Sequence, residues 1–178
     1  GTRIALMAPD GVLWITTFLA SARIGALLTA VSTLCTLAEL AHILRHSDTQ
    51  IFIGEREFLR HDYSNTLSSA LPGLARCRAG ALHTPAAPYL RSIWLGSADG
   101  VNWAGSVADL IALADTPGAP DRELLRVIEQ QVSPTDDAVI VYTSGSTSQP
   151  KAVVHTQRTL ARHPPELAKL FLLQPGDR

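Results

Sequence analysis

Short apolar runs alternate with longer amphipathic segments in the N-terminal part of the chain. The short runs, at 3–8, 27–31 and 50–53, are typical of buried strands, and the longer segments at 11–24 and 36–47 have helical spacing. Parallel strands joined by helices produce this alternation, because a parallel pair needs a long crossover connection. The sequence therefore predicts an α/β fold, a layered βαβ-type sheet with flanking helices.

Both predicted helices carry an apolar stripe that we expect to face the sheet. The stripe of the first helix consists of Ile15, Leu19 and Ala22. The stripe of the second helix consists of Leu37, Leu40, Ala41 and Leu44. Thr36 and Glu39 have the spacing of a capping box, so the second helix is expected to begin just after Thr36.

The rest of the chain contains shorter predicted elements. Pro, Ala and Gly are frequent at 71–88, which predicts a loop, and 92–95 predicts a strand. Helices are expected at 106–114, capped by its first serine, and around the apolar stripe at 124–128. The pair Pro164-Pro165 is expected to interrupt or start a helix, because proline has no backbone N–H to donate.

Composition excludes several classes of protein. Apolar residues make up 46% and charged residues 17% of the 178 residues, which suits one globular domain over 1–178. The net charge of -1 offers no electrostatic basis for binding nucleic acid. Cys35 and Cys77 are too few for a disulfide framework. Cys35 is expected to be a small buried apolar residue rather than a nucleophile.

The apolar stretch at 12–34 approaches the ~20 residues that span a bilayer. Arg23 and Gly25 interrupt it, so a buried helix followed by a buried strand explains the stretch better. We therefore expect no transmembrane segment. The chain also opens without the cationic and apolar leader of a secreted protein, and the expected location is cytoplasmic.

The segment 139–154 joins two apolar, strand-like runs by a connection rich in hydroxyl groups. Gly145 lets the backbone approach a phosphate closely, and Lys151 can neutralise phosphate charge. The hydroxyls that can donate to phosphate oxygens belong to Thr143, Ser144, Ser146, Thr147 and Ser148. The segment therefore predicts a loop that binds a polyphosphate between two strands.

Two other motifs fit the segment less well. A P-loop needs a second glycine before its lysine and a helix after it, whereas Pro150 precedes Lys151 and strand-like residues follow. Ser148 and Lys151 have the Ser-x-x-Lys spacing of penicillin-binding proteins, and a Ser–Lys hydrolase is a third hypothesis. That motif requires a helix that places the lysine one turn after the serine, and the apolar residues after Lys151 argue against it.

The stretch resembles the phosphate-loop signature of the AMP-forming adenylating superfamily, which includes acyl-CoA synthetases, luciferases and peptide-synthetase adenylation domains. That signature is Tyr-Thr-Ser-Gly-Thr/Ser-Thr-Gly-x-Pro-Lys-Gly. The chain matches it at Tyr142, Thr143, Ser144, Gly145, Ser146, Thr147, Pro150 and Lys151. It departs from it at Ser148 and Ala152, where glycine is usual. Further segments that resemble the family lie at 1–10, 18–30, 36–47 and 175–178.

The resemblance implies an ATP-dependent ligase. A carboxylic acid, expected to be a fatty or other apolar acid, would form an acyl-adenylate and then a thioester with CoA. ATP, Mg²⁺ and CoA would take part, with the Mg²⁺ ligands beyond this chain. Lys151 would neutralise phosphate charge during catalysis. The phosphate-binding residues would be Thr143, Ser144, Gly145, Ser146, Thr147, Ser148 and Lys151.

Members of this superfamily run to several hundred residues and include a small C-terminal domain with a catalytic lysine. The resemblance therefore implies that 1–178 is a partial N-terminal domain with its phosphate loop at 142–152, unable to form acyl-adenylate alone. The alternative is a truncated or degenerate module that binds phosphate or ATP without catalysis. Ser148, Ala152 and Pro164-Pro165 are consistent with that alternative.

His42 and His46 lie one helical turn apart, a spacing that metal ligands can have. The glutamate of the His-Glu-x-x-His motif is missing, because position 43 is Ile. We therefore predict that the two histidines lie on a solvated helix face.

Overall fold

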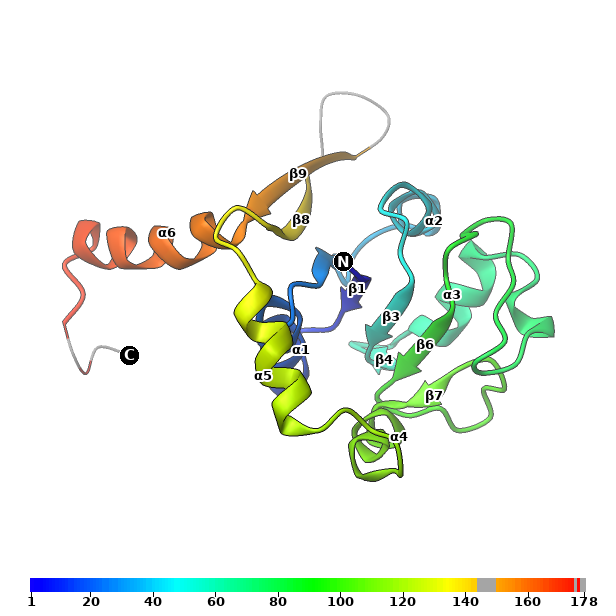
Figure 1. The fold of residues 1–178 in the computed structure, drawn as a ribbon. Helices are drawn as coiled ribbons and strands as arrows, with labels where there is room; N and C mark the ends of the chain where they lie inside the picture. The colour runs from blue at the N-terminus through cyan, green and yellow to red at the C-terminus, as the bar shows by residue number, and fades with distance from the viewer. Residues whose placement is uncertain (144–149, 175, 177–178) are drawn as a thin grey trace.

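The computed structural model describes residues 1–143, 150–174 and 176. Within these residues the main sheet has seven strands in the order β7-β6-β3-β1-β2-β8-β9 (Figure 1). The strands are β1 Arg3–Met7, β2 Leu27–Ala30, β3 Ile51–Gly54, β6 Ser92–Leu95, β7 Gly105–Ser106, β8 Asp137–Thr143 and β9 Lys151–Thr156. All neighbours in this sheet are parallel except β8 and β9. Strands β4 Glu57–Phe58 and β5 His61–Asp62 form a separate antiparallel pair.

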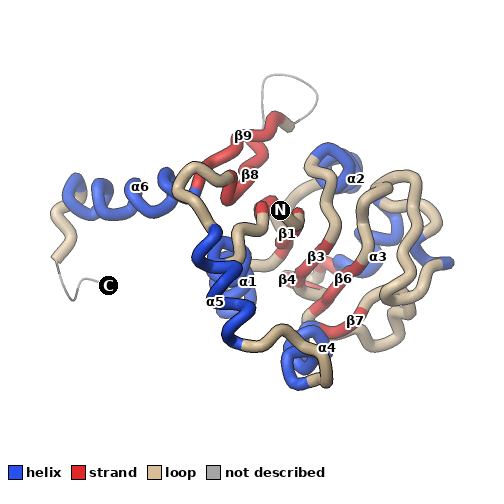
Figure 2. The backbone as a smooth tube through the Cα atoms, viewed as in Figure 1, coloured by secondary structure: helices blue, strands red, loops and turns tan. Residues whose placement is uncertain are grey.

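Helices surround the sheet (Figure 2). The α-helices are α1 Val12–Arg23, α2 Leu37–His46, α3 Tyr63–Ala70, α4 Val107–Ala112, α5 Arg122–Gln131 and α6 Gln157–Leu170. From β2 the chain crosses over β1 to reach β3, so α1 and α2 lie on opposite faces of the sheet. The predicted α/β fold with a mostly parallel sheet is confirmed.

Strand β1 lies at the centre of the sheet and is buried from both faces. Ile4 and Leu6 belong to the apolar cluster that includes residues of α1 and α4. Ala5 and Met7 belong to the cluster on the other face, with residues of α2 and α3. Successive side chains of a strand point to opposite faces, so a strand covered on both sides needs a continuous apolar run.

The face of α1 that packs on the sheet differs from the prediction. Ile15 and Leu19 are 54% and 58% exposed, and Ala22 is half-buried. Trp14 and Phe18 pack against the core instead, with their rings stacked at a centroid distance of 5.3 Å. The two pairs have the same four-residue spacing, and the aromatic pair buries the larger apolar area.

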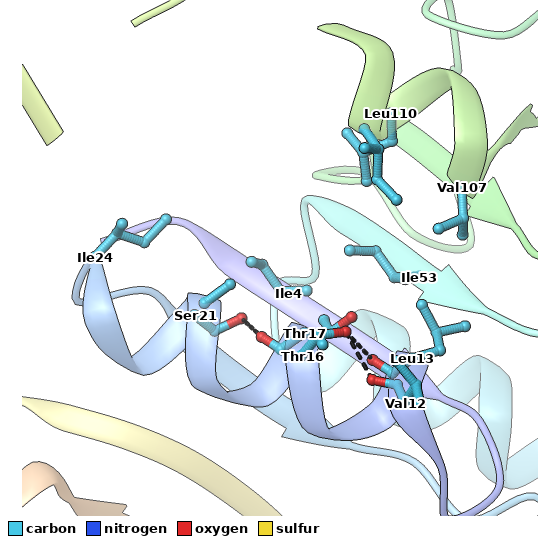
Figure 3. A pocket seen from close by; sticks show the side chains of 12 residues that line it. Ile4, Val12, Leu13, Thr16, Thr17, Ser21, Ile24, Ile53, Val107 and Leu110 are labelled. Carbon is cyan, nitrogen blue, oxygen red and sulfur yellow. Dashed lines mark hydrogen bonds between the residues drawn. The ribbon is translucent and has the colours of Figure 1, made fainter. Parts of the chain in front are cut away.

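A groove of about 530 Å³ lies between α1 and α4 (Figure 3). Among the apolar side chains that line it are those of Ile4, Leu13, Ile24, Ile53, Val107 and Leu110. The hydroxyl of Thr16 donates to the carbonyl of Val12 at 2.7 Å, and that of Ser21 donates to the carbonyl of Thr17 at 2.7 Å. Because these hydroxyls bond within α1, the surface of the groove is mainly apolar.

Helix α2 begins as predicted. The hydroxyl of Thr36 accepts a hydrogen bond from the backbone of Glu39, whose carboxylate accepts one from the backbone of Thr36. Its apolar stripe is only partly as predicted. Leu37 is 48% exposed, whereas Ile43, which lies outside the predicted stripe, is 3% exposed. Leu37 belongs to the first turn, and the turns that pack on the sheet begin with Leu40.

The prediction for Pro164-Pro165 is wrong. Helix α6 runs from Gln157 to Leu170 with both prolines inside it. This helix extends away from the sheet (Figure 1), and the residues at 161–166 are exposed. Water can therefore hydrate the carbonyls of Leu160 and Ala161, which receive no N–H from the prolines, and this reduces the cost of keeping the helix continuous.

The other predicted elements are present. The strand at 92–95 is β6, Ser106 caps α4 in a capping box with Asp109, and the segment at 71–88 is irregular apart from a short 3-10 turn at Leu74–Arg76. The apolar stretch at 12–34 folds as α1 followed by β2. In the described parts of the chain, none of the helices has both the length and the apolar character that crossing a membrane requires.

Candidate phosphate-binding site

The predicted phosphate loop connects two antiparallel strands. Tyr142 of β8 pairs with Ala152 of β9, and Thr143 pairs with Lys151. The hydroxyl of Thr143 donates to the carbonyl of Lys151 at 3.5 Å. Thr143 and Lys151 therefore lie side by side where the two strands meet the connection. The other predicted phosphate-binding residues, Ser144, Gly145, Ser146, Thr147 and Ser148, lie outside the described residues.

The connection starts at the carboxyl end of the parallel sheet. Strand β8 is parallel to β2, with register pairs from Leu28–Val139 to Ala30–Val141. Beyond Val141, β8 pairs only with β9, so the two strands project past the sheet as a ribbon (Figure 1). In open α/β sheets, ligands bind outside the carboxyl ends of the strands. Thr143 and Lys151 are at this end.

The side chain of Lys151 is exposed. Within the described ranges, each ion pair joins other residues: Arg23 with Glu129, Arg126 with Glu123, and Lys169 with Glu166. The Lys151 ammonium is therefore not paired with a described carboxylate, and it can interact with an anionic ligand. Lys151 opens a strand rather than lying in a helix, and this argues against a Ser–Lys hydrolase.

A cavity of about 270 Å³ adjoins the ribbon. Its lining residues are Ala30, Ser32, Leu34, Cys35, Glu39, Ile43, Tyr142 and Pro150. The Glu39 carboxylate accepts hydrogen bonds from the backbone and hydroxyl of Thr36, at 2.8 Å and 2.9 Å, and these bonds lower the pKa of Glu39. A carboxylate that stays charged repels phosphate. The cavity therefore suits a neutral or cationic group better than a phosphate.

Cys35 lies in the wall of this cavity and is half-buried. Burial raises the pKa of its thiol to about 11, and the charge of Glu39 adds to the effect. The thiol therefore stays protonated at neutral pH and is a poor nucleophile. This agrees with the predicted role of Cys35 as a small apolar residue.

His46 is exposed and His42 is half-buried, so the predicted solvated face is present in part, but both rings also contact Tyr142. The two rings stack at a centroid distance of 5.2 Å, and Nδ1 of His46 is 2.8 Å from the hydroxyl of Tyr142. The Tyr142 ring meets both histidine rings edge-on. Burial raises the pKa of Tyr142, and the nearby Asp48 adds to this shift. The contact joins residues that are 96 positions apart, so no local pattern could have predicted it.

Among the residues that the structure describes, the side chains at this end of the sheet do not form a metal-binding group. Among the described residues, no group of three or more His, Cys, Asp and Glu side chains is placed to hold a metal ion. His42 and His46 contact each other and Tyr142, and they do not belong to such a group.

The sequence profile described as AMP-binding enzyme matches residues 1–170. The chain belongs to this family. The resemblance to the AMP-forming adenylating superfamily is thereby confirmed, and the matched region includes the whole β8–β9 ribbon and all of α6.

Several relatives of this AMP-binding chain are CoA ligases. The acyl-CoA ligase SID4 of Ajellomyces capsulatus is 29% identical over 161 residues, which are 90% of this chain and 25% of the relative. The 3-hydroxybenzoate–CoA/4-hydroxybenzoate–CoA ligase of Thauera aromatica is 25% identical over 178 residues, all of this chain and 29% of the relative. The chain thus spans less than a third of the length of either relative.

Solved structures of the family have the same fold. A long-chain-fatty-acid-CoA ligase from Archaeoglobus fulgidus superposes with a TM-score of 0.62 at 20% identity. The match covers 99% of this chain and 29% of that protein. At this identity the likeness supports the fold of the AMP-binding chain, and the acid that the Archaeoglobus protein uses does not transfer with it.

Proposed function

We propose that the protein is an AMP-forming acid–thiol ligase that makes a CoA thioester from a carboxylic acid. The observation that carries the proposal is the pairing of Thr143 with Lys151 at the mouth of the family's phosphate loop. A hydroxyl and an ammonium that pairs with none of the described carboxylates, both at the carboxyl end of a parallel sheet, suit the phosphates of ATP. Membership of the AMP-binding family over 1–170 supports the same activity.

The proposed reaction has two steps. The carboxylate of the acid attacks the α-phosphorus of ATP in line, the bond to the bridging oxygen of pyrophosphate breaks, and an acyl-adenylate forms. The CoA thiol then attacks the acyl carbon and loses its proton, and AMP leaves. Negative charge accumulates on the departing pyrophosphate. Lys151 is proposed to stabilise that charge.

The proposed contacts with the phosphates of ATP come from Thr143, Lys151 and the connection between them. Thr143 and Lys151 would bind oxygens of the β- and γ-phosphates from the two ends of the connection. The same role is proposed from the sequence alone for Ser144, Ser146, Thr147 and Ser148, with Gly145 allowing close approach of the backbone. We propose that residues 1–178 act as an N-terminal part of the family's catalytic unit.

Mg²⁺ commonly accompanies ATP in phosphoryl chemistry, where it bridges phosphate oxygens. Glu39 is the one carboxylate in the described wall of the cavity beside the ribbon, and it already accepts the hydrogen bonds that cap α2. The described residues therefore do not fit a dedicated Mg²⁺ site. We propose that Mg²⁺ would accompany ATP and that the carboxylates that would hold it lie outside residues 1–178, as the family resemblance implies.

The acid is proposed to be a fatty or other apolar carboxylic acid. One sequence relative is named for hydroxybenzoates, which carry a carboxylate on a mainly apolar ring. A comparison of aliphatic and aromatic acids as substrates would test this proposal, and preference for a small polar acid would contradict it.

The test of function is ATP-dependent AMP formation by the intact protein with CoA and a panel of carboxylic acids. Lys151→Ala is expected to lower the rate of acyl-adenylate formation about 100-fold or more, because the charge on the leaving pyrophosphate loses its stabilisation. The matched control is Lys169→Ala, which removes an exposed lysine that is paired with Glu166 on α6.

Three outcomes are distinguishable. An unchanged rate in Lys151→Ala would remove Lys151 from the mechanism. An equal loss in Lys169→Ala would indicate damage to the fold rather than to phosphate binding. ATP binding without AMP formation for any acid in the panel would favour the non-catalytic module.

A further inference from the structure

We propose that His46, supported by His42, is a positioning residue that holds Tyr142 and thereby places Thr143 and Lys151 for ATP. The inference rests on the proposed ligase function and adds to it a role for residues of α2. None of the three aromatic side chains is proposed to touch the substrate.

The ribbon needs an anchor beyond the sheet. Register pairs between β8 and β2 end at Val141, and Tyr142 and Thr143 pair only with β9. A two-stranded ribbon without other support is only marginally stable in water. The contact between Tyr142 and α2 is therefore in the right place to restrain the ribbon, one residue before Thr143.

The contact itself is specific. Nδ1 of His46 and the hydroxyl of Tyr142 are 2.8 Å apart, which is a normal hydrogen-bond distance. His42 stacks on His46 and meets the edge of the Tyr142 ring, with centroid distances of 5.2 Å and 6.3 Å. The tyrosine ring is thus held by one hydrogen bond and by packing against two rings.

The end of α2 is a fixed support for this contact. Ile43 and Leu44 are buried in the core, and Ser47, the residue after the helix, is 1% exposed. The Ser47 hydroxyl donates to the carbonyl of Ile43 at 2.7 Å, and its own carbonyl accepts from the guanidinium of Arg3 at 3.1 Å. His46 therefore belongs to a helix end that is tied to the central strand β1.

A displaced ribbon would move both proposed phosphate contacts together, because Thr143 and Lys151 are register partners. Without the anchor, ATP would have to order the ribbon as it binds, and this cost would appear in the KM for ATP. Once ATP is bound, it holds the ribbon itself. The change in kcat should then be small.

The test is a double-mutant cycle on His46→Leu and Tyr142→Phe in the intact protein. Each single variant is expected to raise the KM for ATP about fivefold, the effect of losing one hydrogen bond, with kcat changed less than about twofold. The double variant should also show about fivefold, because both changes remove the same contact. His46→Asn, whose amide occupies the place of Nδ1, should restore most of the affinity for ATP.

The matched controls are His83→Leu and Tyr89→Phe, which change exposed side chains on the segment between η1 (Leu74–Arg76) and β6. They should leave the KM for ATP unchanged. A multiplicative loss of about 25-fold in the double variant would overturn the inference, because independent contacts multiply. An unchanged KM in both single variants would overturn it as well.

Nitrogen NMR of the histidine rings separates this inference from the proposed function. The His46 Nδ1 signal should shift in Tyr142→Phe, and this readout does not require activity. An unshifted signal in a protein that forms AMP would overturn the inference alone. A shifted signal in a protein that forms no AMP with any acid would overturn the ligase function and, with it, the positioning role.

Discussion

Asp62 caps the N-terminus of α3, and both of its carboxylate oxygens accept hydrogen bonds. Oδ1 accepts hydrogen bonds from the backbone and hydroxyl of Ser64 at 2.9 Å and 2.6 Å, and from the backbone of Asn65 at 3.1 Å. Oδ2 accepts one from the side-chain amide of Asn65 at 2.9 Å. These bonds favour the charged form, and the Ser64 hydroxyl contributes most to lowering the pKa of Asp62.

Replacing this cap should cost stability in a pH-dependent way. Asp62→Ala is expected to lower the free energy of unfolding by about 1 kcal/mol at neutral pH. The folded-state pKa of Asp62 is lower than its unfolded-state pKa of about 4. The charged cap therefore stabilises the folded protein fully at pH values above the unfolded-state pKa. That contribution is lost as the pH falls through the lower folded-state value. Urea unfolding at neutral and acidic pH measures the difference.

Asp62→Asn is the control for this experiment, because asparagine keeps an acceptor at the cap without a titrating group. It should lose much of the pH dependence while keeping part of the stability. A difference between Asp62→Ala and the original protein that stays the same at both pH values would contradict the predicted role of the charge.

Among the elements, α6 and the part of the β8–β9 ribbon beyond Val141 have little support from the rest of the sheet. Every residue of α6 is exposed or half-buried, and Leu160 is the member of the helix that packs against the core cluster. Helix α2, in contrast, has three buried apolar residues, Leu40, Ile43 and Leu44. Stability should therefore differ between these helices, with α6 opening more readily than α2.

The prolines of α6 provide a direct test. Replacing both by alanine, in Pro164→Ala with Pro165→Ala, would restore the N–H groups that can bond to the carbonyls of Leu160 and Ala161. Amide hydrogen exchange in α6 should slow by about tenfold or more, because a proline inside a helix costs about 3 kcal/mol. Pro120→Ala, in the loop before α5, is the control. Unchanged exchange would contradict a continuous helix through 164–165.

At the scale of the whole molecule, helices on both sides of one sheet create two apolar clusters. The parallel strands contribute to both, so substitutions in the sheet affect the molecule more than substitutions on a helix surface. Leu6 of β1 is fully buried, whereas Leu19 of α1 is 58% exposed. The two leucines therefore form a matched pair for measuring what burial contributes.

Leu6→Ala is expected to lower the free energy of unfolding by about 2–5 kcal/mol, since it leaves a cavity in the central strand. Leu19→Ala should cost less than about 1 kcal/mol, because its side chain is largely exposed. Chemical denaturation followed by circular dichroism compares the two. Similar losses would mean that Leu19 faces the core, as the sequence pattern alone had predicted.

The contrast between strands buried on both faces and helices buried on one face explains which features of the fold could be predicted. Strand positions were predictable because a strand buried on both faces needs a continuous apolar run, as at 3–8 and 27–31. The capping box of Thr36 and Glu39 was predictable because its partners are three residues apart. The inner face of α1 was not, since two apolar pairs with identical spacing competed for the sheet.

The candidate site likewise has some features that the sequence predicts and one that it does not. Thr143 and Lys151 were found from the order of residue types along the chain, and their pairing across two strands agrees with the predicted strand–connection–strand arrangement. The contact of His46 with Tyr142 had no signal in the sequence. It depends on how α2 and β8 lie across the sheet, and that arrangement follows from packing over long sequence distances.

The family, the alternation of strands and helices, and the residue types of the predicted phosphate loop can be recognised from the sequence, because each depends on neighbours along the chain. Tertiary packing selects the buried face of α1, allows α6 to continue through two prolines, and brings α2 into contact with Tyr142 of β8. Those outcomes depend on competition for buried area and on solvent access. Both are properties of the packed molecule rather than of any local segment.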